Sequence, residues 1–410
     1  MKLRQFLYSF TFLVVMFILY SCSNKEQIPV ATNVDNTASL QKGNHNPKVS
    51  VFAMGFNNPR ELKFGPDGFL YVAEGGTGGN ISTAGLCDSV IPPIGPYLGG
   101  NTGRISKVDR HGVVTTVADH LPSDQTGPLS GGLCSSVADV AFMGNDLYAI
   151  LAGAGCSHGV ENTPNGIIKV NHDGSWNVVA DLSAYQKTHP VAHPEPDDFE
   201  PDGTWFSFIN VGGDFYAVEP NHGELVKVTT AGNINRVIDF SAIYGHIVPT
   251  VIAYHKGNFY VSNLDTFPVV SGNSSIYKVS PSGHSSVFAT GFSSVTGIVA
   301  DKNNNFFVLE MSDFTGGPAP FTGKVVKVTP SGKQEIVADS LFFPTGMTMG
   351  PDDALYVSNK GFGLPPGAGE ILRIQLKKDE DDHGHGHHGG GDGDGGHHGN
   401  GDGDDGNGHH

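Results

Sequence analysis

The sequence predicts an all-β, six-bladed β-propeller with four-stranded blades, and the first evidence is a turn that recurs along the chain. Five lysines are each followed, five residues later, by a glycine: Lys107 with Gly112, Lys169 with Gly174, Lys227 with Gly232, Lys278 with Gly283, and Lys327 with Gly332. Short runs of alternating apolar and polar residues flank these turns, as expected for β-hairpins. Repeats of about 45 to 50 residues with four short strands are typical of propeller blades.

A second recurring phrase, of aromatic and aliphatic residues, precedes each turn and sets the number of blades. It occurs six times, at 69–72, 147–149, 215–217, 259–261, 306–308 and 355–357. The sixth blade runs out after residue 376, where only its third strand is complete. Residues 49–53 resemble the outer strands of other blades, so we expect the N-terminal segment to supply the missing strand and close the ring.

The chain divides into one propeller, residues 48–378, and segments at both ends. Lys2 and Arg4 precede an apolar run over residues 6–20 that ends next to Cys22. This pattern is typical of a bacterial lipoprotein signal, 1–22, with Cys22 as the lipidated residue. The alternative is an uncleaved membrane anchor, for which the run is short. Residues 23–47 are then a polar linker, and we expect the propeller at the cell envelope, held by lipid on either membrane face.

The last segment, residues 379–410, is rich in His, Gly and Asp and cannot bury a core, so we expect disorder. Its histidines at this density would bind zinc, nickel or copper ions. The candidate ligands are His383, His385, His387, His388, His397 and His398. The alternative is a solubilising tail with incidental metal affinity.

The net charge limits the classes of partner, and the cysteine content limits the disulfides that the chain can form. The net charge is −17 and we find no basic stripe, so nucleic acid is not an expected partner. In an exported protein the cysteines can oxidise. The spacing around the hairpin turn at Gly144 places Cys134 opposite Cys156, which predicts a disulfide between them and leaves Cys87 over.

Polar residues recur at the end of the second strand of the blades, where the repeats align Glu74, Glu219, Asn263, Glu310 and Asn359. Arg60, Glu61 and Asp139 stand at the start of first strands, which lie at the same face near the central channel. Three insertions, 75–102, 153–165 and 183–203, fall on this face too. Loops on one rim of a rigid scaffold commonly carry binding sites.

A ring of carboxylate and amide oxygens is what calcium prefers, so the channel is a candidate calcium site. The alternative is that these residues line a wet channel and cap strand ends, with Arg60 neutralising the carboxylates. His222 beside Glu224 is a candidate general base with an orienting carboxylate. His189 and His193, followed by Glu195, Asp197 and Asp198, form a further metal candidate in an extended, proline-rich loop.

The first blade carries a family resemblance. It reads FNNPRELKFGPDG at 56–68 and LYVAE at 70–74, followed by GRISKV at 103–108 and LPS at 121–123. Over residues 48–376 this resembles the ScyD/ScyE family of exported propellers, named for its association with scytonemin biosynthesis. That family is similar to NHL and SMP-30/gluconolactonase-type propellers, and the resemblance implies the six-bladed fold and export rather than one activity.

Three functions from different classes follow. The leading one is a lipid-anchored propeller that binds a small molecule or a cell-envelope protein through its polar rim. The first alternative is a divalent-metal-dependent hydrolase or lactonase, which needs the channel carboxylates to hold a cation. The second is a quinone-dependent sugar oxidoreductase, which needs a planar cofactor pocket.

Overall fold

The computed structural model describes residues 48–376, except residues 89, 91, 93, 128–132, 196–199, 267 and 315–316. The predicted signal with the lipidated Cys22, the linker 23–47 and the tail 379–410 therefore lie outside the described residues. So do Asp197, Asp198 and the histidines of the tail: His383, His385, His387, His388, His397 and His398. No helix in the described part of the chain is long and apolar enough to cross a membrane.

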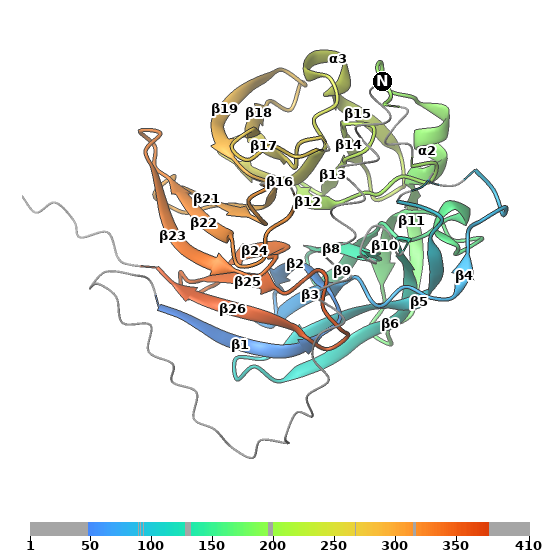
Figure 1. Ribbon diagram of the computed structural model, residues 1–410, viewed down its shortest axis with the longest axis horizontal. Coiled ribbons are helices and arrows are strands. Elements are labelled where there is room, and N and C mark those ends of the chain that lie inside the picture. The colour runs from blue at the N-terminus through green and yellow to red at the C-terminus, as the bar shows by residue number, and fades with distance from the viewer. Residues whose placement is uncertain are drawn as a thin grey trace, which may run out of the picture. The chain divides into compact units, whose positions relative to one another are not determined.

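Six antiparallel sheets surround a common centre, as predicted (Figure 1). Blade one consists of β2 (Pro59–Phe64), β3 (Leu70–Glu74), β5 (Leu98–Val108) and β6 (Val114–Gln125), extended by β4 (Ile81–Ser82) and β7 (Cys134–Ser135). Blade two consists of β8 (Val137–Met143), β9 (Asp146–Leu151), β10 (Gly166–Val170) and β11 (Trp176–Asp181). Blade three consists of β12 (Ser207–Val211), β13 (Asp214–Glu219), β14 (Glu224–Val228) and β15 (Ile234–Asp239).

The other three blades repeat the same order from the centre outward. Blade four consists of β16 (Pro249–His255), β17 (Asn258–Asn263), β18 (Ser274–Val279) and β19 (Ser285–Phe292). Blade five consists of β20 (Val295–Ala300), β21 (Phe306–Glu310), β22 (Gly323–Val328) and β23 (Gln334–Leu341). Blade six consists of β24 (Gly346–Met349), β25 (Leu355–Asn359), β26 (Gly369–Gln375) and β1 (Lys48–Phe56).

The N-terminal strand closes the ring, which confirms the prediction. β1 runs antiparallel to β26, with Lys48 opposite Gln375 and Val51 opposite Leu372. The first strands of successive blades contact one another in a complete cycle, from β2 through β8, β12, β16, β20 and β24 back to β2. Because the two ends of the described chain share one sheet, the last blade cannot form without β1.

The recurring glycine has the conformation that the repeat required of it. Gly112, Gly174, Gly232, Gly283 and Gly332 all have φ between +81° and +84°. Each of these glycines also donates its N–H to the carbonyl three residues earlier. A side chain disfavours this backbone region, so the turn selects glycine.

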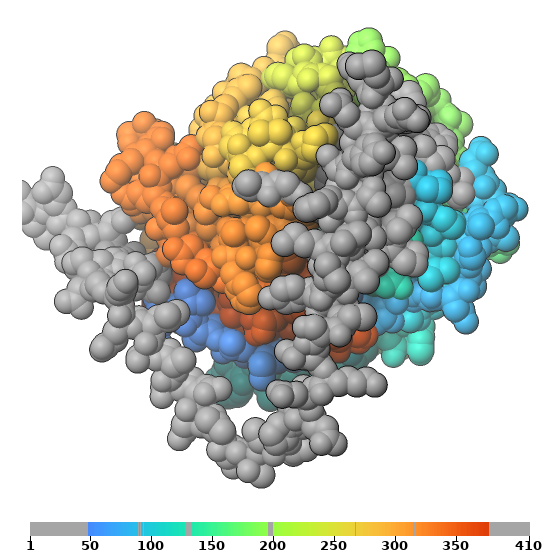
Figure 2. Space-filling model, in the orientation of Figure 1, coloured from blue at the N-terminus to red at the C-terminus, as the bar shows by residue number. Residues whose placement is uncertain are grey.

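The core lies between neighbouring blades, where apolar side chains of adjacent sheets pack together. One cluster joins blades two and three and includes Ile150, Trp205, Phe208 and Phe215, all fully buried. In the space-filling view, the segment around β4 lies at the outer edge of the molecule (Figure 2). Among the residues that the structure describes, the helices outside the sheets are α2 (Leu182–Thr188), α3 (Ser241–Tyr244) and the 3-10 turn η2 (Cys156–His158).

Candidate functional site

The recurring polar residue at the end of the second strand acts as a latch within its own blade. Glu74 Oε2 accepts a hydrogen bond from the N–H of Asn57 (2.8 Å), and Glu310 Oε2 accepts one from Ser293 (3.0 Å). Asn359 Oδ1 does the same for Phe342 (2.9 Å). Each latch ties the segment entering the first strand to the end of the second.

The other two latches bind the same entering segment, one as acceptor and one as donor. Glu219 Oε1 accepts from the N–H of Thr204 (3.2 Å), and Asn263 Nδ2 donates to the carbonyl of Ile247 (2.8 Å). All five latch residues are buried. A buried backbone N–H or carbonyl without a partner would cost free energy, and the polar side chain removes this cost by bonding to it. The polar residue at this position therefore has a structural role.

The latches also contact the third strand of their blade rather than one another. Arg104 donates two hydrogen bonds of 2.8 Å to Glu74, and Lys324 lies 3.3 Å from Glu310. Across the described residues, no three or more His, Cys, Asp and Glu side chains are arranged to hold a metal ion. The calcium prediction therefore has no gathered set of carboxylates to support it.

Arg60 holds two distant segments together at the start of β2. Its guanidinium donates to the carbonyls of Gly361, in blade six, and Cys134, just before blade two. Arg60 of blade one thus connects blade six with the segment that leads into blade two. Arg60 neutralises none of the latch carboxylates directly, in contrast to the expected ion pair.

Glu61 and Asp139 occupy the same position in blades one and two, and the structure brings them together through Lys63, which the sequence analysis missed. Lys63 Nζ lies 3.8 Å from Glu61 Oε2 and 3.9 Å from Asp139 Oδ1. Burial raises the pKa of Glu61 to about 8, although the positive charge of Lys63 opposes this. Lys63 follows Glu61 by two positions on one strand, so strand periodicity could have identified it.

The described residues of the three predicted insertions are joined into one unit, which we call the braced rim and which covers the described parts of 75–97, 153–165 and 183–203. The first insertion is shorter than predicted because β5 already starts at Leu98 and pairs with β4. The third insertion contains α2, which begins where Asp181 accepts a hydrogen bond from Ala184 N (2.8 Å).

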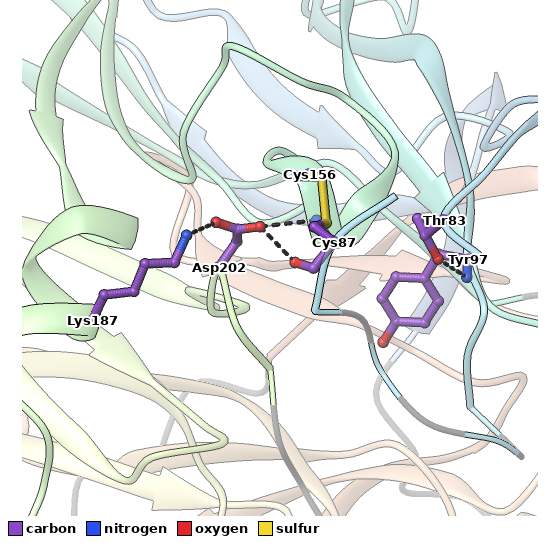
Figure 3. Close-up of a disulfide and its surroundings, with 7 residues drawn as sticks. Thr83, Cys87, Tyr97, Cys156, Lys187 and Asp202 are labelled. Atoms are coloured by element: carbon purple, nitrogen blue, oxygen red, sulfur yellow. Dashed lines mark hydrogen bonds and ion pairs between the residues drawn. A yellow bond between two sulfur atoms is a disulfide. The ribbon is translucent and has the colours of Figure 1, made fainter. Parts of the chain in front are cut away.

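A disulfide between Cys87 and Cys156 links the first two insertions, with 6.3 Å between the Cα atoms (Figure 3). The predicted Cys134–Cys156 disulfide is wrong. The hairpin ladder of blade two begins at Val137, and Cys134 instead pairs with Gln125 of blade one in β7. Cys134 stays a buried thiol, whose pKa burial raises to about 11.

Asp202 ties the third insertion to the second (Figure 3). Its carboxylate accepts hydrogen bonds from Ser157 N (2.9 Å) and Ser157 Oγ (2.7 Å), next to the disulfide. On its other side it forms an ion pair with Lys187 of α2. The close-up also shows Thr83 accepting from Tyr97 N (2.9 Å), which fixes the first insertion beside the disulfide.

His158 is fully buried at the centre of the braced rim, and no sequence motif pointed to it. Its Nδ1 bonds to Asp124, its Nε2 bonds to the carbonyl of Gly203 (3.1 Å), and Glu200 lies 3.9 Å away. Burial alone would lower the pKa of His158, but the negative charge of Asp124 and its neighbours outweighs burial and raises the pKa to about 9. His158 is fully buried and already bonded at both ring nitrogens, so it stabilises the braced rim.

His222 lies at the edge of the braced rim and keeps 15% of its side-chain exposure. Its Nδ1 is 3.4 Å from Glu219, and its ring hydrogen-bonds to Gln186 of α2. Glu224, which the sequence analysis placed beside His222, forms an ion pair with Arg236 (2.6 Å), whereas His222 forms its ion pair with Glu219. The turn after β13 folds His222 back onto the carboxylate three residues earlier.

The two histidines of the proline-rich loop make different contacts. His189 ends α2 and stacks on Tyr185 with the ring centroids 4.4 Å apart, whereas His193 donates its backbone N–H to Ser241 (3.1 Å). The described residues of this loop do not form a metal-binding group.

Comparisons with known proteins identify the fold of the chain but do not assign it to a family. No protein-family model matches the chain, and no curated protein matches its sequence. A structural-genomics protein of unknown function from Bacteroides thetaiotaomicron is similar, with a TM-score of 0.52 at 11% identity over 80% of this chain and 76% of that one.

Two further solved structures share the architecture. A gluconolactonase from Xanthomonas campestris has a TM-score of 0.50 at 9% identity, over 80% of this chain and 90% of that one. An auxiliary nutrient-binding protein from Bacteroides thetaiotaomicron has a TM-score of 0.50 at 9% identity, over 82% of this chain and 78% of that one. The chain is thus a β-propeller with an enzyme and a binding protein among its structural neighbours.

Proposed function

We propose that the chain is a ligand-binding propeller whose braced rim is the recognition surface. The observation that carries this is the linkage of three insertions from separate parts of the sequence by a disulfide and buried hydrogen bonds. Loops fixed before binding lose less conformational entropy when a partner arrives. A repeat that needs only short connections gains nothing in fold stability from long loops, so their retention favours recognition.

Exposed side chains on the braced rim supply contacts for such a partner. Ile81 and Leu86 are 50% and 46% exposed, and Lys187 is 53% exposed at its side chain. Apolar contacts ringed by polar groups suit a small molecule with an apolar face or a protein segment. We further propose that Cys22 carries a lipid that holds this propeller at the cell envelope, because an apolar run preceded by Lys2 and Arg4 ends next to it.

The alternative function is a divalent-metal-dependent hydrolase, for which the gluconolactonase neighbour is a precedent in fold. The same fold also serves a nutrient-binding protein, so fold alone does not decide between them. The latch geometry favours binding, because Glu74, Glu219 and Glu310 each have structural partners in their own blade. Calcium titrations of the full chain and of Glu310→Gln test the alternative: equal heats support the binding proposal, and a site lost in the variant supports the hydrolase.

Site-specific photo-crosslinking tests the proposal directly. A crosslinking amino acid replaces Leu86 on the braced rim or, as a matched control, Ile336 on the outer strand β23, which is 62% exposed. In the intact cell envelope we expect a discrete adduct from position 86 and none from position 336. Equal labelling from both positions would contradict a recognition role for the rim.

A further inference from the structure

Blade one continues beyond its four strands as a small sheet at the braced rim, formed by β4, β5, β6 and β7. In β4, Ile81 lies opposite Gly99 of β5, and Ser82 lies opposite Leu98. Within the described part of the chain, β4 pairs with β5 alone, and Figure 1 shows β4 at the periphery of the molecule. β4 is therefore an edge strand of this small sheet.

The backbone of β4 has hydrogen-bonding groups on its open side. Thr83 donates its N–H to the carbonyl of Tyr97 (3.0 Å), so Thr83 directs its backbone groups toward β5. Because these directions alternate along a strand, the N–H and carbonyl of Ser82 point away from β5. Asn80, Ile81 and Ser82 are all exposed, so a partner in solution can reach this edge.

The sequence around β4 lacks the residues that usually keep a sheet edge from pairing. Residues 75–86 contain no charged residue and no proline. Two apolar side chains beside the edge are about half exposed, Ile81 at 50% and Leu86 at 46%. The disulfide at Cys87 fixes this segment before a partner arrives, which reduces the entropy lost on binding.

The outer strands of the blades, by contrast, are protected. Four of them carry an aspartate two residues after the bulge in the strand: Asp119, Asp181, Asp239 and Asp339. In blade six, a Cβ at Gly112 would lie 2.3 Å from the carbonyl oxygen of Phe52, so the turn of blade one lies against β1. In blade four, Gln334 donates to the carbonyl of Thr290 in β19 (3.0 Å). Charges and covering segments keep such edges from pairing, and β4 has neither a charge nor a second pairing strand.

We propose that the edge at β4 binds an extended segment of another protein, which adds to the small sheet as a further strand. A carbonyl of that segment accepts from the N–H of Ser82, and its uncharged side chains contact Ile81 and Leu86. An extended backbone matches this edge because it offers donors and acceptors at strand spacing. The inference rests on the recognition role of the braced rim and names the kind of partner.

Ser82→Pro tests the proposal in the full chain, with a crosslinking amino acid at position 86 in the intact cell envelope. Proline removes the outward N–H, and an edge strand tolerates proline where its N–H faces solvent. Ser82→Ala is the matched control, because it keeps the N–H while both variants lose the contact of Ser82 Oγ with Ala84 N (3.3 Å). We expect the adduct to fall about tenfold in Ser82→Pro and to stay at the parent level in Ser82→Ala.

A second measurement does not depend on the folding of Ser82→Pro. Short diazirine amino acids at position 80 or 82 label the partner, and mass spectrometry maps the labelled residues. Strand addition places both labels on one segment of the partner, about two residues apart.

Equal adducts from Ser82→Pro and Ser82→Ala, or labels scattered over separate segments of the partner, would overturn strand addition and leave the recognition role intact. An adduct made of two copies of this chain would overturn the assignment to another protein. Absence of any adduct from position 86 in the parent would contradict the recognition role of the braced rim, and this inference with it.

Discussion

The two halves of the rim stand on the same repeat but are stabilised by different interactions. In blades four to six, the connections after the second strand are 264–273, 311–322 and 360–368, and the latches Asn263, Glu310 and Asn359 hold the strand ends. In blades one to three, the braced rim adds a disulfide, the buried His158–Asp124 ion pair and the partly exposed Lys187–Asp202 ion pair to the same scaffold. The repeat needs only the latch, so the additional links serve the insertions.

The largest expected effect comes from removing the disulfide of the braced rim. Cys87→Ser combined with Cys156→Ser opens a crosslink between residues 69 apart in sequence. The chain-entropy model gives about 4 kcal/mol for a loop of that length, and we expect the free energy of unfolding to fall by up to this amount. Urea denaturation of the oxidised parent and the double variant measures it. An unchanged midpoint would mean that the disulfide does not brace the fold.

The second prediction uses pH to isolate His158. Because its folded-state pKa of about 9 exceeds the ordinary value of 6.5, its stabilisation is fully present below about pH 6.5 and is lost as pH rises through 9. The shift corresponds to about 3 kcal/mol. We expect His158→Ala to lose stability at pH 6 and to show a flatter decline between pH 6.5 and 9 than the parent.

His255, which bonds to Asn304 in blades four and five, is the matched control for His158. His255→Ala should keep the decline of the parent over the same pH range. If both variants flatten the decline of stability equally, the protonation of His158 is not the source of that decline.

The third prediction concerns the latch, which both halves share. Asn359→Ala leaves the N–H of Phe342 without its acceptor (2.9 Å in the parent), which should lower the free energy of unfolding by about 1–2 kcal/mol. Asn359→Asp keeps the acceptor oxygen but replaces the amide that donates to Glu370 Oε1 (2.8 Å) by a second carboxylate, so it should not recover the stability of the parent. Chemical denaturation compares the three proteins, and equal stability of Asn359→Ala and the parent would remove the latch interpretation.

The smallest effect is expected for an exposed ion pair away from the braced rim. Lys302 and Asp353 are each 75% exposed, so solvent screens their attraction and Asp353→Asn should leave thermal stability unchanged. Lys187→Gln breaks an ion pair whose carboxylate, on Asp202, is only 7% exposed, so this variant should lower thermal stability measurably. A larger loss in Asp353→Asn than in Lys187→Gln would reverse the order that the comparison requires.

The fold was predictable because its determinants are local and repeated. The turn glycines, the strand phrases and the missing outer strand of blade six can all be recognised within about 50 residues of sequence. The recurring polar position was also located correctly. Its role stayed open between a calcium ligand and a cap on the strand end, because only the folded chain shows which backbone N–H lies beside Glu74 and Glu310.

The braced rim could not be predicted, because its contacts join separate insertions. Cys87 and Cys156 meet only after blades one and two have packed, and hairpin register alone assigned Cys156 to Cys134 instead. The negative charge of Asp124 stabilises the protonated form of His158, and Asp124 lies on the outer strand of another blade. Long-range proximity of this kind leaves no periodic trace in the sequence.

The most direct test of the central claim compares the two halves of the rim by photo-crosslinking in the intact envelope. A crosslinker at Leu86 samples the braced rim, and one at Phe321, which is 63% exposed between β21 and β22, samples the plain half. The account predicts an adduct from position 86 that disappears in the variant lacking the Cys87–Cys156 disulfide. An adduct from position 321 alone, or one from position 86 that persists without the disulfide, would contradict it.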